Sequence, residues 1–542
     1  MPKDLLSSGR KDPWQLPAWL LAALVVIPTA TLFASFFSPE REILEHLADN
    51  VLPGLLVNTF KLIFGVGIFT LVVGVSLGWL TGACSFPGRC FFSWALALPM
   101  AIPAYVMAFI FLGLMDFSGP LQGWIRTIDG FERFMVEVRT TPFVVTVLGL
   151  TLYPYVYLLS RTSFLGQGRA AMEAARMLGV GPLRAFFRVA FPISRPWIAA
   201  GIALVLMETL ADFGAVSIFN FDTFTTAIYK SWYGFFSLQA AAQLSSLLVL
   251  FALVLIVTES RLKSKMRFYD SSRGGAVHSR LHLRGWKAAA ATLYCTFIFS
   301  IAFVIPLFRL TGWAVETLAG GMGTNYLPHA GRTLFLGILS ALLISLAALL
   351  LAFAKRRSTS RLNHLLCRIA TVGYALPGTV LAVAIFLPVA WFDKAVQAVL
   401  LHLFGLEINQ VFLGTLVVMF GAYLVRFLAV AFSSVDSGMQ NIKPNLDEAA
   451  AILGVKGGKA IFRIYLPLLN KSCLTALVLV LVDVLKEMPI TLMTRPFGWD
   501  TLAVKIYELT SEGEWERAAL PGLYLVAAGI LPVFLLIRKL EK

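Results

Sequence analysis

The chain has 542 residues, of which 58% are hydrophobic and 14% charged, and its formal net charge is +15. Soluble globular proteins carry charge on about a quarter of their residues, so this composition excludes an ordinary water-soluble enzyme or binding module and indicates lipid as the main solvent. Lys and Arg fall in alternate loops, as the positive-inside rule expects. This distribution indicates that the basic residues set the orientation of the helices in the membrane, and it argues against nucleic-acid binding.

About twelve apolar runs are long enough to cross a bilayer, since a transmembrane helix needs about 20 such residues. They are centred near residues 27, 68, 102, 151, 206, 248, 298, 343, 381, 421, 482 and 527. The first run begins at Pro17, and its length and lack of a small-residue cleavage site favour an uncleaved anchor over a signal peptide. The pattern predicts an all-α integral membrane protein of about twelve transmembrane helices with both termini in the cytoplasm.

Two segments of the chain repeat each other. EAARMLGVGPLRAFFRVAFP begins at Glu173, and EAAAILGVKGGKAIFRIYLP begins 275 residues later at Glu448. MAIPAYVMAFIFL from Met100 likewise matches YALPGTVLAVAIFL from Tyr374. Six predicted crossings separate the first pair, an even number, so the halves are predicted to be parallel six-helix repeats. We predict a first half at 1–258 with its loop at 165–195, a basic cytosolic linker at 259–287, and a second half at 288–542 with its loop at 440–470.

In both repeated loops, the positions of glycine and proline predict a short helix, a turn and a second short helix. In the first loop Gly179 breaks a helix-forming run, Pro182 can open a second helix, and Pro192 is predicted to end it. Gly454 and Pro467 are predicted to do the same in the second loop. One amphipathic helix lying on the membrane is the alternative, but two matching copies favour docking on two equivalent partner surfaces.

The loop residues resemble a known signature. E-A-A, three residues, Gly, nine residues and I-x-L-P is typical of the permease subunits of binding-protein-dependent ABC importers. The first loop has Val189 and Phe191 where the signature has Ile and Leu, and the second matches fully. The matching residues are Glu173, Ala174, Ala175, Gly179 and Pro192, and Glu448, Ala449, Ala450, Gly454 and Pro467. In that family the loop is a coupling helix held in a groove of the ATPase, so the resemblance implies two ATPase subunits.

The tandem duplication, together with ADFGAVSIF from Ala211 and LKEMPITLMTRPFGWDTLAVKIYEL from Leu485, looks most like the ferric-iron importer permeases. The resemblance covers nearly the whole chain. It implies a bacterial inner-membrane permease that receives ferric iron from a periplasmic ferric-iron-binding protein and has no cofactor of its own. A fused permease for thiamine or another small solute is the nearest alternative. A proton-coupled secondary transporter is an alternative of a different class, but it leaves both loops unexplained.

The sequence shows no catalytic machinery. The closest approach to a phosphate-binding loop, LGVKGGKAIF, has Leu453 in place of the first Gly and Ala460 in place of Ser or Thr. ATP is therefore expected to be bound by a partner subunit, and the chain itself is predicted not to be an enzyme. The cysteines lack C-x-x-C spacing and His partners, which predicts free thiols and no firmly bound metal. They are Cys84, Cys90, Cys295, Cys367 and Cys473.

Four carboxylates fall inside predicted spans, where charge is costly and indicates function. They are Glu208 and Asp212 after the first loop, and Asp483 and Glu487 at the same 275-residue offset after the second. The i,i+4 spacing would place each pair on one helix face. A rise of about 1.5 Å per residue puts the first member of each pair, Glu208 or Asp483, about 17 Å from the cytosolic end of its helix. We predict a path for a hard, oxygen-seeking cation. The alternative is that they pair with Lys486, Arg495 or helix ends and only lock the bundle.

Two more segments repeat on the predicted periplasmic side. Residues 220–234 and 496–509 each contain Asp-Thr followed by Ile-Tyr, and both are predicted to be loops. They are expected either to touch a binding protein or to fold back over the mouth of the bundle.

Overall fold

A computed structural model gives the fold of the chain. It describes residues 15–37, 45–117, 119–128, 137–165, 177, 179–264, 280–320, 326–358, 360–406, 410–443, 445–452, 455 and 458–541. Within these ranges the regular secondary structure is helical apart from one pair of two-residue strands, β1 (Cys84–Ser85) and β2 (Leu281–His282). The predicted all-α class is confirmed.

Most of the predicted membrane spans coincide with described helices that could cross a membrane. Ten are long and apolar enough to cross a membrane, and the pair Gly458–Leu468 and Asn470–Lys486, bent by 83°, gives up to eleven. The run expected near residue 527 coincides with helix α26 (Trp515–Glu541), which is not among these ten or eleven candidates. The described part of the chain therefore has ten or eleven candidate spans, where the sequence predicts about twelve.

Helix packing divides the chain into two compact units that do not follow the order of the repeats. Unit 1 contains Met1–Ser38 and Gly331–Asp500, and unit 2 contains Pro39–Ala330 and Thr501–Lys542. Each unit thus takes its helices from both halves of the sequence.

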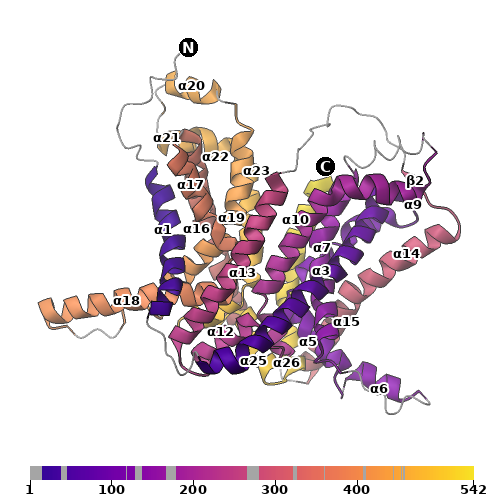
Figure 1. The fold of residues 1–542 in the computed structure, drawn as a ribbon, viewed down its shortest axis with the longest axis horizontal. Coiled ribbons are helices and arrows are strands. Elements are labelled where there is room, and N and C mark those ends of the chain that lie inside the picture. Colours follow the sequence, from indigo (N-terminus) through magenta and orange to yellow (C-terminus); the bar gives the residue numbers. More distant parts are fainter. Residues whose placement is uncertain are drawn as a thin grey trace. The chain divides into compact units, whose positions relative to one another are not determined.

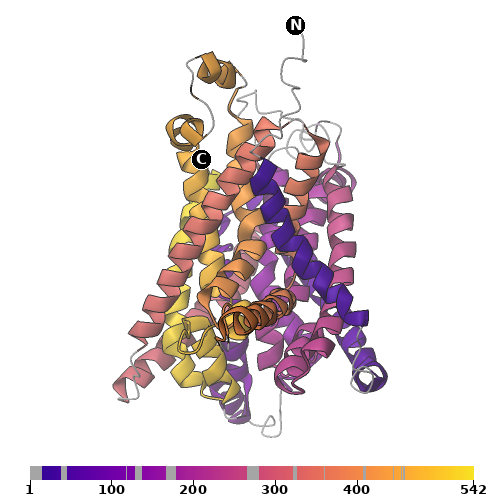
Figure 2. The same cartoon turned by 90° about the vertical axis from the view of Figure 1, so that its left-hand side faces the viewer.

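Unit 1 joins the first membrane helix to the second repeat. Its elements are α1 (Gln15–Ala34), η2 (Ser35–Phe37), most of α16 (Leu327–Arg357), α17 (Arg361–Ala370), η7 (Val372–Ala375), α18 (Gly378–Phe404), α19 (Leu416–Gln440), α20 (Asn445–Ile452), α21 (Gly458–Ala460), η8 (Ile461–Tyr465), α22 (Leu466–Leu468), α23 (Asn470–Lys486) and α24 (Pro489–Thr494). Helix α1, indigo in Figures 1 and 2, packs on α17 and α18. The Thr31 hydroxyl lies 3.5 Å from the carbonyl of Ala384 on α18. The N-terminal helix therefore belongs by packing to the second repeat.

Unit 2 joins the first repeat to helices from the second. Its elements are η3 (Leu47–Val51), α3 (Leu52–Ala83), β1, α4 (Arg89–Ala95), η4 (Leu98–Ala101), α5 (Ala104–Met115), α6 (Pro120–Arg126), α7 (Thr141–Leu165), α9 (Pro182–Ala185), η5 (Phe186–Ala190), α10 (Phe191–Ala211), α11 (Gly214–Ile218), α12 (Phe224–Tyr233), α13 (Leu238–Ser264), β2, α14 (Trp286–Phe299), η6 (Ser300–Val304), α15 (Ile305–Ala319), α25 (Leu502–Ser511) and α26. Helix α3 lies along α7, and α15 packs on α26. A Cβ at Gly74 of α3 would lie 2.7 Å from Val156 Cβ, so glycine permits the close approach of α3 and α7.

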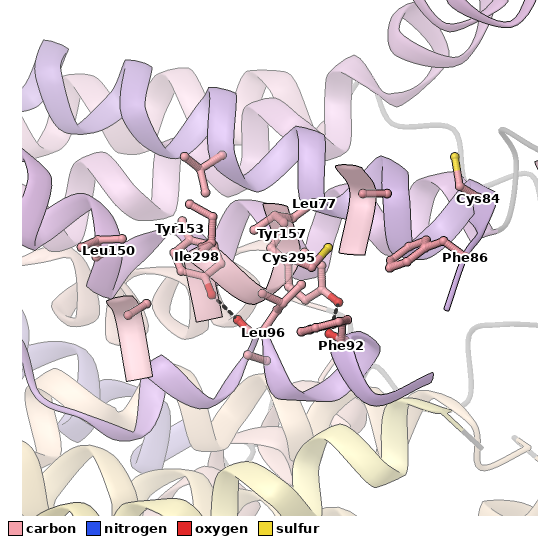
Figure 3. Packing of buried hydrophobic residues seen from close by; sticks show 14 of the residues in the cluster. Leu77, Cys84, Phe86, Phe92, Leu96, Leu150, Tyr153, Tyr157, Cys295 and Ile298 are labelled. Atoms are coloured by element: carbon pink, nitrogen blue, oxygen red, sulfur yellow. Dashed lines mark hydrogen bonds between the residues drawn. The ribbon is translucent and has the colours of Figure 1, made fainter. Parts of the chain in front are cut away.

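A buried cluster shows how α14 is held in unit 2. Tyr153 of α7 donates a hydrogen bond of 2.8 Å to the carbonyl of Leu96, and the Tyr157 hydroxyl lies 3.4 Å from the carbonyl of Phe92 (Figure 3). Tyr157 also donates to the carbonyl of Ser93 at 2.8 Å. Cys295 of α14 is fully buried in the same cluster. Just before α14, β2 pairs in parallel with β1, which aligns Cys84 with Leu281 and Ser85 with His282. The end of the linker is therefore fixed to the first repeat.

Four π-helical turns interrupt the helices, and each ends two residues before a proline. The turns are η3, η5, η6 and η8, and the prolines are Pro53, Pro192, Pro306 and Pro467. A proline ring clashes with the carbonyl four residues earlier in an α-helix, and a wider turn moves that carbonyl away. The prediction that Pro192 and Pro467 end helices is wrong, because both lie in the first turn of the next helix, α10 and α22.

Candidate coupling loops and membrane carboxylates

The first repeated loop turns where the sequence predicts. Gly179 has a φ of 76°, in the left-handed region that favours glycine. Helix α9 opens at Pro182, and the chain continues through η5 into α10 without leaving a helical path. Glu173, Ala174 and Ala175 lie outside the described residues.

The second loop contains a separate helix, α20, and Figure 1 shows it beyond the ends of the longer helices of unit 1. Glu448 on this helix is exposed and Ala450 is buried. After the helix, the amide of Val455 donates to the carbonyl of Ala450 at 2.9 Å. Gly454 and the side chain of Ala449 lie outside the described part of the chain.

Both loops expose apolar side chains at equivalent positions. Met177 is 90% exposed and its counterpart Ile452 is 86% exposed. Phe187 and Phe462, also 275 residues apart, are 61% and 62% exposed. These phenylalanines were not predicted as functional residues, although the Phe-Arg pair recurs in both loops. Large apolar side chains rimmed by polar residues are typical of protein interaction surfaces.

Asp212 lies at a helix break. Helix α10 ends at Ala211 and α11 begins at Gly214, so Glu208 and Asp212 do not share one continuous helix as the spacing predicts. The Asp212 carboxylate accepts a bond of 3.0 Å from the amide of Val216 in the short helix that follows. Such a bond satisfies an amide that the helix itself leaves without a partner.

Glu487 lies at the equivalent break between α23 and α24. One carboxylate oxygen accepts from the amide of Ile490 at 3.2 Å, and the other lies 3.2 Å from Arg426 Nε on α19. Arg426 also donates to the carbonyl of Leu376 at 3.2 Å. A Cβ at Gly378 would lie 2.6 Å from the same carboxylate, so only glycine leaves room for the pair. Arg426 was not predicted from the sequence, because an isolated arginine in an apolar run does not reveal its partner.

The four predicted carboxylates fall in different packing units. Glu208 and Asp212 belong to unit 2, whereas Asp483 and Glu487 belong to unit 1. Glu208 and Asp483 are half-buried. The structure gives Arg495, named in advance as a possible partner, a salt bridge of 2.9 Å with Asp500. Among the described residues, three or more His, Cys, Asp or Glu side chains do not gather in a metal-binding group.

The two other repeated segments are mostly helical, which corrects the predicted loops. They form α12 and α25, and in each the Asp-Thr pair precedes the helix. Thr223 forms a capping box with Thr226, and Thr501 accepts from the amide of Val504 at 3.4 Å. Thus the repeated threonines act as helix caps.

The two helices also meet within unit 2. The rings of Tyr229 on α12 and Tyr507 on α25, which are equivalent in the repeats, have centroids 6.3 Å apart. Phe213, next to the α10 break, lies 5.1 Å from the first ring and 5.6 Å from the second. Equivalent segments of the two repeats therefore pack together beside Asp212.

Comparison with known families adds to this geometry. A family model described as "Binding-protein-dependent transport system inner membrane component" matches residues 74–262 and 344–542. The two matches together cover more than half of the chain, and each contains one repeated loop.

Individual relatives differ in how much of the chain they match. The Fe(3+)-transport system permease protein FbpB 2 of Haemophilus influenzae is 26% identical over 536 residues, which is 97% of this chain and 99% of that protein. The ferric transport system permease protein FbpB of Actinobacillus pleuropneumoniae is 23% identical over 85% of this chain and 68% of its own length. The sulfate transport system permease protein CysW of Escherichia coli K12 is 29% identical over 36% of this chain and 66% of its own length.

Proposed function

The chain belongs to the family of binding-protein-dependent transport system inner membrane components, and we propose that the solute it carries is ferric iron. It is a multi-pass permease of an ABC importer and not itself a catalyst. The support for iron is the near end-to-end similarity to a relative whose name is Fe(3+)-transport permease, whereas the sulfate relative matches about a third of the chain.

The two repeated loops are proposed to dock two ATPase subunits in the cytosol, with both termini on that side. Met177 and Phe187 on the first loop, and Ile452 and Phe462 on the second, would supply the apolar contacts. Large side chains in a desolvated pocket carry most of the binding energy of a protein interface. The equal exposure of equivalent residues supports two similar docking surfaces, with the repeats at 1–258 and 288–542 joined by a linker at 259–287.

The cation path is proposed to pass the helix breaks at Asp212 and Glu487, with Glu208 and Asp483 nearer the cytosol. Arg426 offsets the charge of Glu487, whereas the Asp212 carboxylate accepts from the backbone amide of Val216, so the two repeats would contribute unequally. Carboxylate oxygens suit a hard cation such as ferric iron and oppose the passage of an anion such as sulfate. This chemistry supports the iron proposal independently of the relatives.

The test is uptake of radiolabelled ferric iron into proteoliposomes that hold the chain, its co-purified ATPase and a periplasmic ferric-binding protein. We expect ATP-dependent uptake that Gly454→Asp, in the second loop, abolishes. Gly123→Asp serves as the control, because space surrounds Gly123 on α6. ATP hydrolysis without iron uptake would overturn iron, and thiamine is then the next solute to supply. Uptake without any ATPase would contradict the docking proposal and favour proton coupling.

A further inference from the structure

Arg356, in the last turn of α16, holds the chain that leads into the second coupling loop. Its guanidinium donates to three carbonyls at the end of α19 and just beyond it. They are Met439 at 2.7 Å, Ile442 at 3.0 Å and Lys443 at 3.4 Å. The last carbonyls of a helix lack partners within the helix and carry partial negative charge, so a forked cation is well suited to bind them. Helix α20 begins two residues later, at Asn445.

The same side chain also reaches the segment that follows the loop. The Arg356 guanidinium carbon lies 5.7 Å from the ring centroid of Tyr465, at the end of η8. Tyr465 is 3% exposed and packs against Phe353, one turn earlier on α16, with centroids 5.3 Å apart. One residue of α16 therefore contacts both the entry to the loop and the exit from it.

A neighbouring ion pair reinforces the entry. Lys355 Nζ lies 2.7 Å from the Asp436 carboxylate on α19, which also accepts from Gln440 at 2.7 Å. Two consecutive basic residues of α16 thus hold the last two turns of α19.

The first loop is held by different chemistry. Gly82 lies 21 residues before Pro103, as Arg356 lies 21 residues before the matched Pro377. A Cβ at Gly82 would meet Phe164 Cβ at 3.2 Å, so that position has no room for a long side chain. Instead, Trp79 on α3 packs on Phe186 of η5, with centroids 4.8 Å apart. The exit of the first loop is thus packed on an aromatic side chain of α3, whereas Arg356 of α16 bonds carbonyls at the entry to the second loop.

We infer that Arg356 is a positioning residue that fixes the base of the second coupling loop to α16, so that movement of α20 is transmitted to the membrane helices. The inference rests on the proposed docking of an ATPase at this loop. It predicts that the two loops respond differently when Arg356 is lost.

Spin labels at two equivalent positions test this role of Arg356 without any substrate. In a Cys90→Ser background, Ile452→Cys reports on the second loop and Met177→Cys on the first. We expect Arg356→Ala to increase label mobility at 452 and leave it unchanged at 177. Arg357→Ala is the matched control, because it removes the same charge from the next residue, whose guanidinium lies over the Phe353 ring at 5.9 Å. Unchanged mobility at 452, or an equal increase at both sites, would overturn the inference.

Coupling in the reconstituted complex gives the second readout. Arg356→Ala should lower the solute transported per ATP hydrolysed by about threefold or more, within the range for mutations that change coupling. Arg356→Lys keeps the charge but cannot bond several carbonyls with a planar fork, so it should restore coupling only in part. Full coupling in Arg356→Ala would contradict the inference. If the parent complex transports no iron, the proposal of iron as the solute fails. The label mobilities still show whether Arg356 fixes the second loop.

Discussion

Arg426 Nε lies 3.2 Å from Glu487 Oε2, and the two side chains are 11% and 6% exposed within unit 1. The pair joins α19 to the break between α23 and α24, and the arginine also binds the carbonyl that precedes α18. Three helical segments therefore meet at one buried pair of opposite charges. Removing one partner of such a pair leaves an uncompensated charge, which costs more than losing the pair.

We predict that Arg426→Met lowers the free energy of unfolding by about 3 kcal/mol or more, because Glu487 is left charged in an apolar site. The double variant Arg426→Met with Glu487→Gln should recover much of that loss. Thermal unfolding of the purified protein in detergent measures both. A single variant as stable as the double variant would show that the pair does not neutralise the site.

Gly378 offers a second test of the same contact region. Its Cβ position lies 2.6 Å from Glu487 Oε1 and 3.1 Å from Arg426 Nη1, so Gly378→Ala should displace the pair and cost about 1–3 kcal/mol of overpacking. Gly421→Ala on α19 is the matched control, because nothing lies within 4 Å of its Cβ position. Equal melting temperatures for the two alanine variants would contradict the prediction.

Asp393 holds the chain that follows α18. Its buried carboxylate accepts from the amides of Val411, Phe412 and Leu413 at 2.9 to 3.2 Å. Asp393→Ala should destabilise this segment by about 1–3 kcal/mol, because buried amides lose their acceptor. Hydrogen exchange at residues 411–413 is the measurement, and it should become faster. The exposed neighbour Lys394 supplies the control, since Lys394→Ala should leave these amides protected.

The cysteines should differ sharply in reactivity. Burial raises the pKa of the Cys367 thiol to about 11, whereas Cys90 is exposed. The thiolate is the reactive form, so Cys367 stays protonated near neutral pH and becomes reactive only as the pH approaches its raised pKa. We expect maleimide to modify Cys90 and spare Cys367 at pH 7.5, as read by mass spectrometry. In a Cys90→Ser variant, labelling of Cys367 at that pH would refute the prediction.

Composition and local sequence patterns were enough to predict the class of the protein and the location of its loops. Composition and run length identify membrane helices because lipid requires about 20 apolar residues whatever the partners are. The turn at Gly179 was predictable because a left-handed backbone conformation is a local property of glycine. The repeat located the second loop, since equal segments at a fixed offset indicate equal structures.

The choice of packing partners for the helices, and of partners for the charged side chains, could be seen only in the folded chain. Helices that are apolar on all sides carry no periodic signal that selects a neighbour, so the packing of α1 with the second repeat and of α14 with the first was not predictable. The Arg426 partner of Glu487 lies on another helix, and the breaks after Ala211 and Lys486 interrupt apolar runs that read as continuous. Local sequence fixes local conformation, whereas these contacts depend on where the whole chain brings distant residues.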